Sequence, residues 1–131
     1  IAAVVEESLR LYGVVQYRQR ICVQDVRIGK TEIKSGQTVY LLNAAANRDP
    51  DHYACPAQLD LGRRSPTDHL AFGRGSRSCV GSQLARLELR EVLNQMLQRW
   101  PAMRLDPECP PPSFTGIIHR QVRPLNLRLV D

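Results

Sequence analysis

The sequence lacks any hydrophobic run close to the ~18 residues that a membrane-spanning helix needs, so it predicts no transmembrane segment. A basic segment followed by an apolar stretch, the pattern of a secretory signal, is absent as well. The four cysteines lie far apart, without a C-x-x-C pair or a histidine at zinc-finger spacing, which argues against a structural zinc site. The length of the chain and its ordinary core composition argue against a disulfide framework. We therefore expect reduced thiols and a cytoplasmic protein.

Lysine is also scarce, since only two of the 18 basic residues are lysine and the rest are arginine. The net charge is +5, but the arginines are scattered from Arg10 to Arg128 without a dense stripe, and aromatic residues are few. This pattern argues against nucleic-acid binding. Because a guanidinium is a planar fork suited to carboxylates, the arginines favour acidic partner proteins or buried carboxylates that need charge partners.

The first half of the 131 residues changes pattern twice. Residues 1–11 have helical spacing of apolar and charged positions, and residues 14–42 alternate like the strands of small antiparallel hairpins. Residues 47–67 are expected to be irregular, because proline and glycine interrupt them repeatedly. Since Ile1 already lies inside a helical pattern, we expect the chain to be a piece of a longer protein.

A long amphipathic helix is predicted from residue 82 to Trp100, where Pro101 prevents its continuation. Its apolar residues form one stripe, and Arg86 and Arg90 are expected on the polar face that points away from it. The residues that follow are expected to be extended and to end in a hairpin. Together these segments predict an α+β fold class.

The strongest indication of function is the glycine-rich segment from Phe72 to Gly81, in which Cys79 lies just before the predicted long helix. Backbone N–H groups and the helix dipole stabilise negative charge there, so Cys79 is placed to be a thiolate. Gly75 and Gly81 permit the close approach of a bulky planar ligand beside the sulfur. Arg77 is placed to neutralise an acidic group of that ligand.

This segment has three other interpretations. A phosphate-binding loop is disfavoured, because the segment is too short and lacks the Lys-Ser/Thr pair of a P-loop. A catalytic cysteine–histidine pair stays open, with His52, His69 and His119 as candidates, although no local signature supports it. A plain turn before a core helix explains the glycines but leaves the Arg-x-Cys arrangement unexplained.

The segment resembles the haem-binding signature of the cytochromes P450, F-x-x-G-x-R-x-C-x-G. The matching positions are Phe72, Gly75, Arg77, Cys79 and Gly81. Two further motifs occur in the expected order: residues 7–10 resemble the E-x-x-R motif, and residues 47–63 resemble the meander segment that ends in the arginine of a Glu-Arg-Arg triad. The resemblance is closest to soluble bacterial members and covers the whole chain.

The resemblance implies that Cys79 is the axial thiolate ligand of the iron in haem b, iron protoporphyrin IX. Phe72 would pack against the thiolate, with an ordinary core phenylalanine as the alternative. Arg77 and Arg20 would pair with haem propionates, although Arg20 could instead be an exposed strand arginine. His69 is a further propionate candidate, and a histidine that caps the loop is its alternative.

The resemblance also implies a buried ion-pair triad of Glu7, Arg10 and Arg63 that holds the loop under the haem. Glu6 is a competing partner for Arg10 at i, i+4 spacing, but the family pattern selects Glu7. Residues 14–17 and 114–118 correspond to segments that contact substrate in the family. Ordinary core packing is the alternative for both.

The function implied is monooxygenation, in which one oxygen atom from O₂ is inserted into a small organic substrate. Electrons would come from a ferredoxin-type or flavin reductase donor. We expect residues 1–131 to form the C-terminal, haem-binding part of such a domain, without its distal helix and N-terminal lobe. The rival interpretation is an inactive, truncated haem-binding or interaction remnant.

Overall fold

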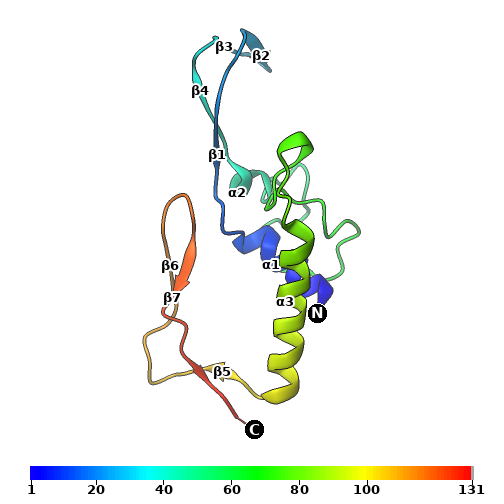
Figure 1. Cartoon of the computed structure of the whole chain (residues 1–131), viewed down its shortest axis with the longest axis vertical. Coiled ribbons are helices and arrows are strands. Elements are labelled where there is room, and N and C mark those ends of the chain that lie inside the picture. Colours follow the sequence, from blue (N-terminus) through cyan, green and yellow to red (C-terminus); the bar gives the residue numbers. More distant parts are fainter. Residues whose placement is uncertain (131) are drawn as a thin grey trace.

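Two helices, α1 (Ala2–Tyr12) and α3 (Ser82–Arg99), pack against each other at the centre of the molecule, and two β arms extend from them (Figure 1). The computed structural model describes residues 1–130. Both helices confirm the sequence prediction to within a residue or two at each end. Helix α3 ends at Arg99 because the proline at position 101 disfavours helical geometry at Trp100.

The first β arm is built from two antiparallel pairs. Strand β1 (Arg18–Ile21) pairs with β4 (Thr38–Leu41), and β2 (Val26–Ile28) pairs with β3 (Thr31–Ile33) at the tip. The prediction of antiparallel hairpins is confirmed. The partner of β1 is β4, because the β2–β3 hairpin is inserted between these two strands in the sequence.

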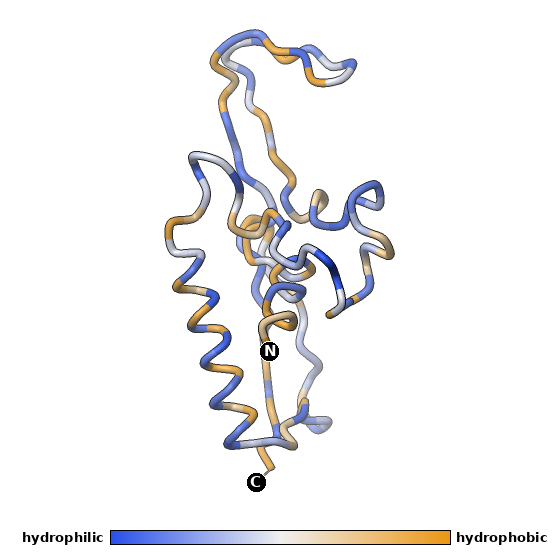
Figure 2. Tube along the Cα trace, turned by 90° about the vertical axis from the view of Figure 1, so that its right-hand side faces the viewer, coloured by the Kyte–Doolittle hydropathy of each residue, from blue (hydrophilic) through white to orange (hydrophobic). Residues whose placement is uncertain are grey.

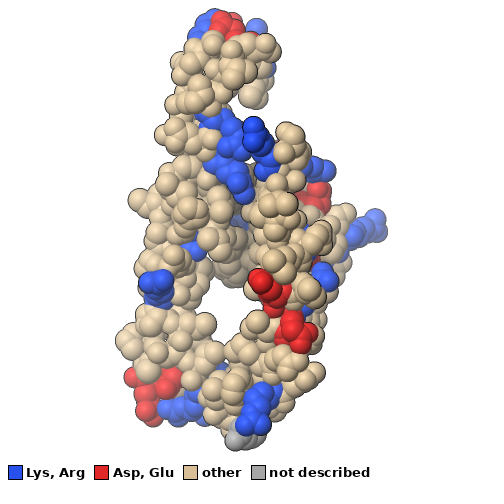
Figure 3. Space-filling view, viewed as in Figure 1, with Lys and Arg blue, Asp and Glu red and all other residues tan. Residues whose placement is uncertain are grey.

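The second β arm begins after α3, and its last strand pairs with its first, so the chain comes back close to the end of that helix. Strand β5 (Arg104–Leu105) pairs with β8 (Leu127–Arg128), and β6 (Ser113–Thr115) forms the terminal hairpin with β7 (Gln121–Arg123). Figure 3 shows an opening through the molecule between this arm and the helices. The tip of the hairpin closes back on the segment after α1, where Gln16 donates its backbone N–H to Ile118 O at 3.0 Å.

Helix α2 (Asn43–Ala46) introduces the long irregular stretch that was predicted. Residues 47–74, all described by the structure, contain no helix or strand, and a 3-10 turn, η1 (Gly75–Arg77), precedes α3. Side chains hold this stretch where regular backbone pairing does not. Asn47 is buried, for example, and its Oδ1 accepts the backbone N–H of Leu70 at 2.7 Å.

The buried centre of the molecule is more polar than apolar. Only four hydrophobic residues of the described chain are buried: Val5, Leu11, Tyr53 and Ala71. The buried polar and charged residues are Glu6, Glu7, Arg10, Asn43, Asn47 and His69. Three of them lie on α1, and hydrogen bonds join these to Asn47 and His69 of the irregular stretch.

Helix α3 has no buried residue in the described chain, and Leu89, Val92 and Leu97 of its predicted apolar stripe are 40%, 55% and 43% exposed. Figure 2 shows apolar and polar positions alternating along this helix. The predicted apolar stripe is therefore present but uncovered along much of its length. No helix within residues 1–130 is long and apolar enough to cross a membrane.

Candidate functional site

Cys79 lies two residues before the N-cap of α3, and its side chain is exposed. Its backbone N–H donates to Phe72 O at 2.8 Å, and its carbonyl accepts the N–H of Ser82 at 3.2 Å. These two bonds fasten the cysteine between the start of the loop and the first turn of α3. The sulfur therefore stands at a helix N-terminus, where partial positive charge favours an anionic group.

Two glycines of the loop adopt the left-handed backbone conformation that side chains rarely allow. Gly73 has φ +73° and Gly75 has φ +75°. A Cβ on Gly75 would meet no atom within 4 Å, so the backbone here borders open space. A Cβ on Gly81 would lie 4.0 Å from the sulfur of Cys79, which leaves the sulfur unobstructed on that side.

Cationic side chains gather on the face between β1 and the loop before α3 (Figure 3). Arg20 is exposed on β1, and its one side-chain hydrogen bond within residues 1–130 goes to the neighbouring carbonyl of Gln19, at 2.7 Å. Arg77 is exposed in η1, and the structure gives its side chain no carboxylate partner within residues 1–130. Both predicted propionate ligands thus have guanidinium groups available on the surface.

Arg18 is a third cation at this face that the sequence reasoning missed. Its guanidinium lies 3.5–3.8 Å from where a Cβ on Gly73 would stand, and its buried Nε has no hydrogen-bond partner in the described chain. The available signal was positional, because residues 18 and 20 of one strand project to the same side. Arg18 therefore joins the group of candidate ligands for an anion.

The structure brings Glu7, Arg10 and Arg63 together. Arg10 donates from Nε and Nη2 to the two carboxylate oxygens of Glu7, at 2.8 and 2.7 Å, and Arg63 Nε donates to Glu7 Oε1 at 2.9 Å. The side chains of Glu7 and Arg10 are 2% and 1% exposed. The hydrogen bonds from Arg10 are the main reason that the pKa of Glu7 falls to about 2, against the opposing effect of burial.

Arg10 also holds the irregular stretch directly. Its guanidinium donates to the backbone carbonyls of Asn47 at 2.8 Å, Pro56 at 2.7 Å and Gln58 at 3.0 Å. Glu7 holds the same stretch by accepting the backbone N–H of Asp60 at 2.9 Å. We call this arrangement of Glu7 and Arg10 against the irregular stretch the clamp. Backbone groups that have no regular secondary-structure partner are therefore satisfied by one buried ion pair.

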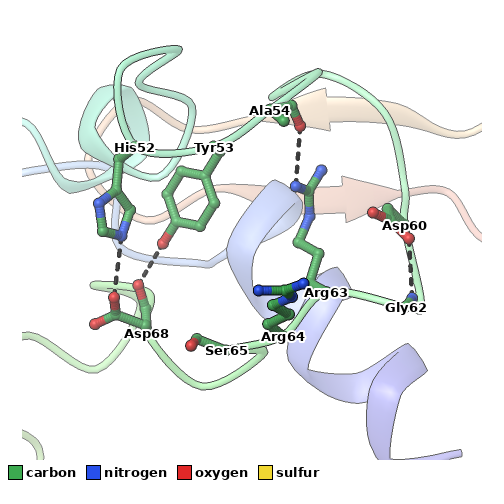
Figure 4. A pocket seen from close by; sticks show the side chains of 9 residues that line it. All are labelled: His52, Tyr53, Ala54, Asp60, Gly62, Arg63, Arg64, Ser65 and Asp68. Atoms are coloured by element: carbon green, nitrogen blue, oxygen red, sulfur yellow. Dashed lines mark hydrogen bonds and ion pairs between the residues drawn. The ribbon is translucent and has the colours of Figure 1, made fainter.

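Figure 4 shows the outer side of this clamp, where Arg63 donates to Ala54 O at 3.0 Å. A cavity of about 440 Å³ lies here, and charged residues such as Arg64 and Asp68 line it. His52 Nε2 is 3.0 Å from a carboxylate oxygen of Asp68. None of the lining residues belongs to the loop from Phe72 to Gly81, so this cavity is separate from the sulfur of Cys79.

His69 lies in a second buried cluster, away from the exposed cations. Its Nε2 is 3.1 Å from Glu6 Oε2, and its Nδ1 accepts the N–H of Ala71 at 3.3 Å. Because Nδ1 is an acceptor, the ring proton lies on Nε2 and is donated to Glu6. Burial lowers the pKa of His69, which keeps the ring neutral. Both nitrogens are engaged, so this geometry favours the loop-capping alternative over a propionate contact.

Arg86 completes that second cluster, and here the sequence prediction was wrong. Instead of pointing away from the molecule, its Nε donates to Glu6 Oε1 at 2.7 Å, and its side chain is only 12% exposed. Burial opposes ionisation of Glu6, but the hydrogen bond and charge of Arg86, together with the hydrogen bond from His69, lower its pKa overall. Glu6 therefore pairs with Arg86 and His69, and Arg10 is left to Glu7.

The guanidinium of Arg86 also lies 4.7 Å from the ring centroid of Phe72. Phe72 is half-buried, and its carbonyl oxygen accepts the backbone N–H of Cys79. A cation at this distance over an aromatic ring is attracted by the ring quadrupole. Phe72 thus links the cluster of Glu6, His69 and Arg86 to the loop that carries Cys79.

The cytochrome P450 family profile matches residues 1–127. The chain belongs to the cytochrome P450 family. It is 44% identical over 105 residues to the biotin biosynthesis cytochrome P450 of Bacillus subtilis, an alignment that covers 80% of this chain and 26% of that protein. It is also 35% identical to the mitochondrial 25-hydroxyvitamin D-1 alpha hydroxylase of Mus musculus, over 100% of this chain and 27% of that protein.

Solved cytochrome P450 structures share the fold of this chain. The crystal structure of P450BioI with an acyl carrier protein ligated to hexadec-9Z-enoic acid superposes with a TM-score of 0.90 at 36% identity, covering 98% of this chain and 33% of that one. CYP109E1 from Bacillus megaterium in complex with testosterone gives a TM-score of 0.92 at 29% identity, over 98% of this chain and 36% of that one. The α+β cytochrome P450 fold is thereby confirmed, and the chain spans about a quarter to a third of these relatives.

The residues present fit the haem that this family implies. The exposed thiol at the start of α3 would supply a soft sulfur donor, and no atom within 4 Å of a Cβ on Gly75 would obstruct a flat ligand beside the loop. The unpartnered, buried Nε of Arg18 and the exposed guanidinium of Arg77 are donors for carboxylates. No group of three or more histidine, cysteine or acidic side chains in residues 1–130 could hold a bare metal ion.

Proposed function

We propose that this chain is the haem-binding, C-terminal part of a haem-thiolate monooxygenase, with Cys79 as the axial ligand of haem b. The observation that carries the proposal is the placement of Cys79. Its exposed side chain stands at the start of α3, and a backbone bond to Phe72 holds it beside the open space at Gly75. When bound, a thiolate-ligated haem supplies O₂ activation and the insertion of one oxygen atom into an organic substrate.

The cations of the same face would hold the two haem propionates. Arg20 and Arg77 present exposed guanidinium groups, and Arg18 adds a donor whose Nε has no partner in the described chain. Guanidinium groups bind carboxylates through two parallel hydrogen bonds, which fixes the orientation of the bound group as well as its position. In this proposal Gly75 and Gly81 keep the face of the loop clear of side chains.

Two segments are proposed to contact the substrate. A β-bridge joins Val15 to His119, and Arg120 N donates to Val14 O at 2.7 Å, so residues 14–17 and 114–118 lie side by side although about a hundred residues separate them. Exposed apolar side chains line this junction, including Ile117 at 82% and Val14 at 54%. We expect a small organic substrate, because apolar lining with few polar groups is typical of such pockets.

Catalytic turnover also requires a complete substrate pocket and a covered oxygen-binding face, which residues 1–131 do not form by themselves in this proposal. The chain spans about a quarter to a third of its relatives, so we propose that the segments those relatives have in addition complete the substrate pocket and the oxygen-binding face. Electrons would come from a ferredoxin-type or flavin reductase donor in the cytoplasm. A haem-binding or interaction module without turnover is the competing function.

An isotope experiment separates these two functions. The full-length, haem-loaded protein is supplied with an electron donor, ¹⁸O₂ and a panel of apolar compounds, and products are examined by mass spectrometry. Monooxygenation predicts one ¹⁸O atom in the product and none in a parallel reaction with Cys79→Ser. Haem loading without any labelled product across the panel supports the interaction module instead.

A further inference from the structure

A buried charge cluster remains that the proposed function does not use. Glu6 of α1, His69 of the irregular stretch and Arg86 of α3 meet in it, with side chains that are 3%, 1% and 12% exposed. Through His69 this cluster also holds the irregular stretch against the helices, in addition to the triad around Glu7. Its position against the cysteine loop indicates a further task.

We propose that Glu6 and Arg86 form a positioning pair that orients Phe72 and sets the charge balance behind the sulfur of Cys79. This inference rests on the proposed function, since it assumes that Cys79 ligates haem iron. Arg86 lies 4.7 Å from the centroid of the Phe72 ring, and the carbonyl of Phe72 accepts the N–H of Cys79 at 2.8 Å. The ring therefore connects the guanidinium to the loop that carries the sulfur.

The geometry of Arg86 is fixed from two sides. Its Nε donates to Glu6 Oε1 at 2.7 Å, and its Nη1 contacts Ser82 O in the first turn of α3 at 3.5 Å. Glu6 is itself fixed by His69, whose ring nitrogen lies 3.1 Å from the second carboxylate oxygen. With both ends held, the guanidinium stays over the Phe72 ring without sampling the other rotamers that a solvated arginine adopts.

The pair also has an electrostatic consequence because water screens it poorly. A guanidinium that is 12% exposed interacts with nearby charge more strongly than a surface cation, and the Glu6 carboxylate offsets it. Among residues 1–130, Arg90 is the one further guanidinium near this carboxylate, at 3.6 Å, and its side chain is 44% exposed. Charges close to a metal ligand tune the reduction potential of the metal.

The two partners should therefore move the potential in opposite directions. One-electron reduction of ferric haem to ferrous haem adds one negative charge beside the sulfur and breaks no protein bond. Glu6→Gln leaves the Arg86 cation without its counter-charge, which stabilises the reduced form and raises the potential. Arg86→Gln leaves the carboxylate without its cation and lowers the potential.

The test is a spectroelectrochemical titration of the full-length, haem-loaded protein and its variants, reduced with dithionite. Arg90→Gln is the matched control, because it removes the same charge from the same helix one turn further along and makes no contact with Phe72. We expect shifts of opposite sign for Glu6→Gln and Arg86→Gln, a smaller shift for Arg90→Gln, and a return toward the wild-type potential in the Glu6→Gln/Arg86→Gln double variant.

A purely structural cluster would lower the melting temperature of both single variants and leave their potentials equal, or shift both the same way. Either result overturns the inference. If a single variant fails to load haem, Arg86→Lys replaces it as the test, because it keeps the charge: a potential equal to that of the wild type supports the inference, and a potential shifted in either direction contradicts it. Absence of a thiolate spectrum from the wild-type protein would contradict the proposed function instead, which keeps the two failures distinguishable.

Discussion

The carboxylate of Glu7 and the guanidinium of Arg10 form a two-point ion pair, with N–O distances of 2.8 and 2.7 Å, inside a centre almost closed to solvent. The pair occupies one turn of α1, yet apart from the bond to Arg63 its other hydrogen bonds go to backbone groups between Asn47 and Asp60. A helix is thereby joined to a stretch that has no regular structure of its own. The stability of that stretch depends on the charge pair more than on apolar burial.

Removing one member of this pair should be strongly destabilising. Glu7→Gln or Arg10→Met leaves a buried charge without its partner, and we expect a loss of about 3–5 kcal/mol in the free energy of unfolding. Chemical denaturation of the haem-loaded protein measures it. The control is Lys34→Met, which breaks an exposed pair with Asp25 and should leave the stability almost unchanged. Equal effects at the two sites would show that the Glu7 pair is an ordinary surface contact.

The lowered pKa of Glu7 predicts a pH dependence of stability. Its folded-state pKa of about 2 lies below the ordinary value of 4.5, so the unfolded chain binds the proton more readily. The contribution of Glu7 is therefore complete above about pH 4.5 and is lost as the pH falls toward 2. Unfolding measured across this range should show a steeper loss for the wild type than for Glu7→Gln. Parallel curves would contradict the assignment.

A side chain at position 75 should weaken haem binding, beyond any effect of the backbone strain that the substitution introduces. Gly75→Ala places a Cβ at φ +75° in the open space beside the loop, where haem is proposed to lie. Gly36→Ala is a matched control, since its φ is +85° and its Cβ would also meet nothing within 4 Å. Both variants should lose about 1–2 kcal/mol through backbone strain. Only Gly75→Ala should release haem faster in a transfer assay to apomyoglobin, and equal release rates would refute the location.

Local patterns in the sequence were enough to predict both helices, the antiparallel hairpins and the irregular stretch between them. Periodicity and a proline at position 101 delimit α3, and these signals act over a few residues. The burial of Arg86 could not be predicted this way, because its partner Glu6 lies 80 residues earlier and its helix face reads as polar. Arg18 was missed for a related reason: the backbone of Gly73, from a distant segment, covers its side chain.

Residues 1–131 alone should be catalytically incompetent. Apolar side chains such as Leu84, Leu87 and Ile117 are 60%, 63% and 82% exposed, which exceeds the scattered exposure usual for a monomer. We expect the isolated chain to bind a hydrophobic dye strongly, to associate, and to consume electrons without forming product. Size-exclusion chromatography, dye fluorescence and a hydroxylation assay check these points. Stereoselective hydroxylation by a monomer of these residues would overturn the expectation.

The absorption spectrum of the reduced carbon monoxide complex tests the central claim most directly. If Cys79 ligates the haem iron, the full-length protein should show the red-shifted Soret band of thiolate ligation, and Cys79→Ala should abolish it. Cys22→Ala, Cys55→Ala and Cys109→Ala are controls that should each retain the band, because these thiols lie outside the loop that begins α3. A Cys79→Ala protein that keeps the red-shifted band would contradict the assignment of the haem ligand.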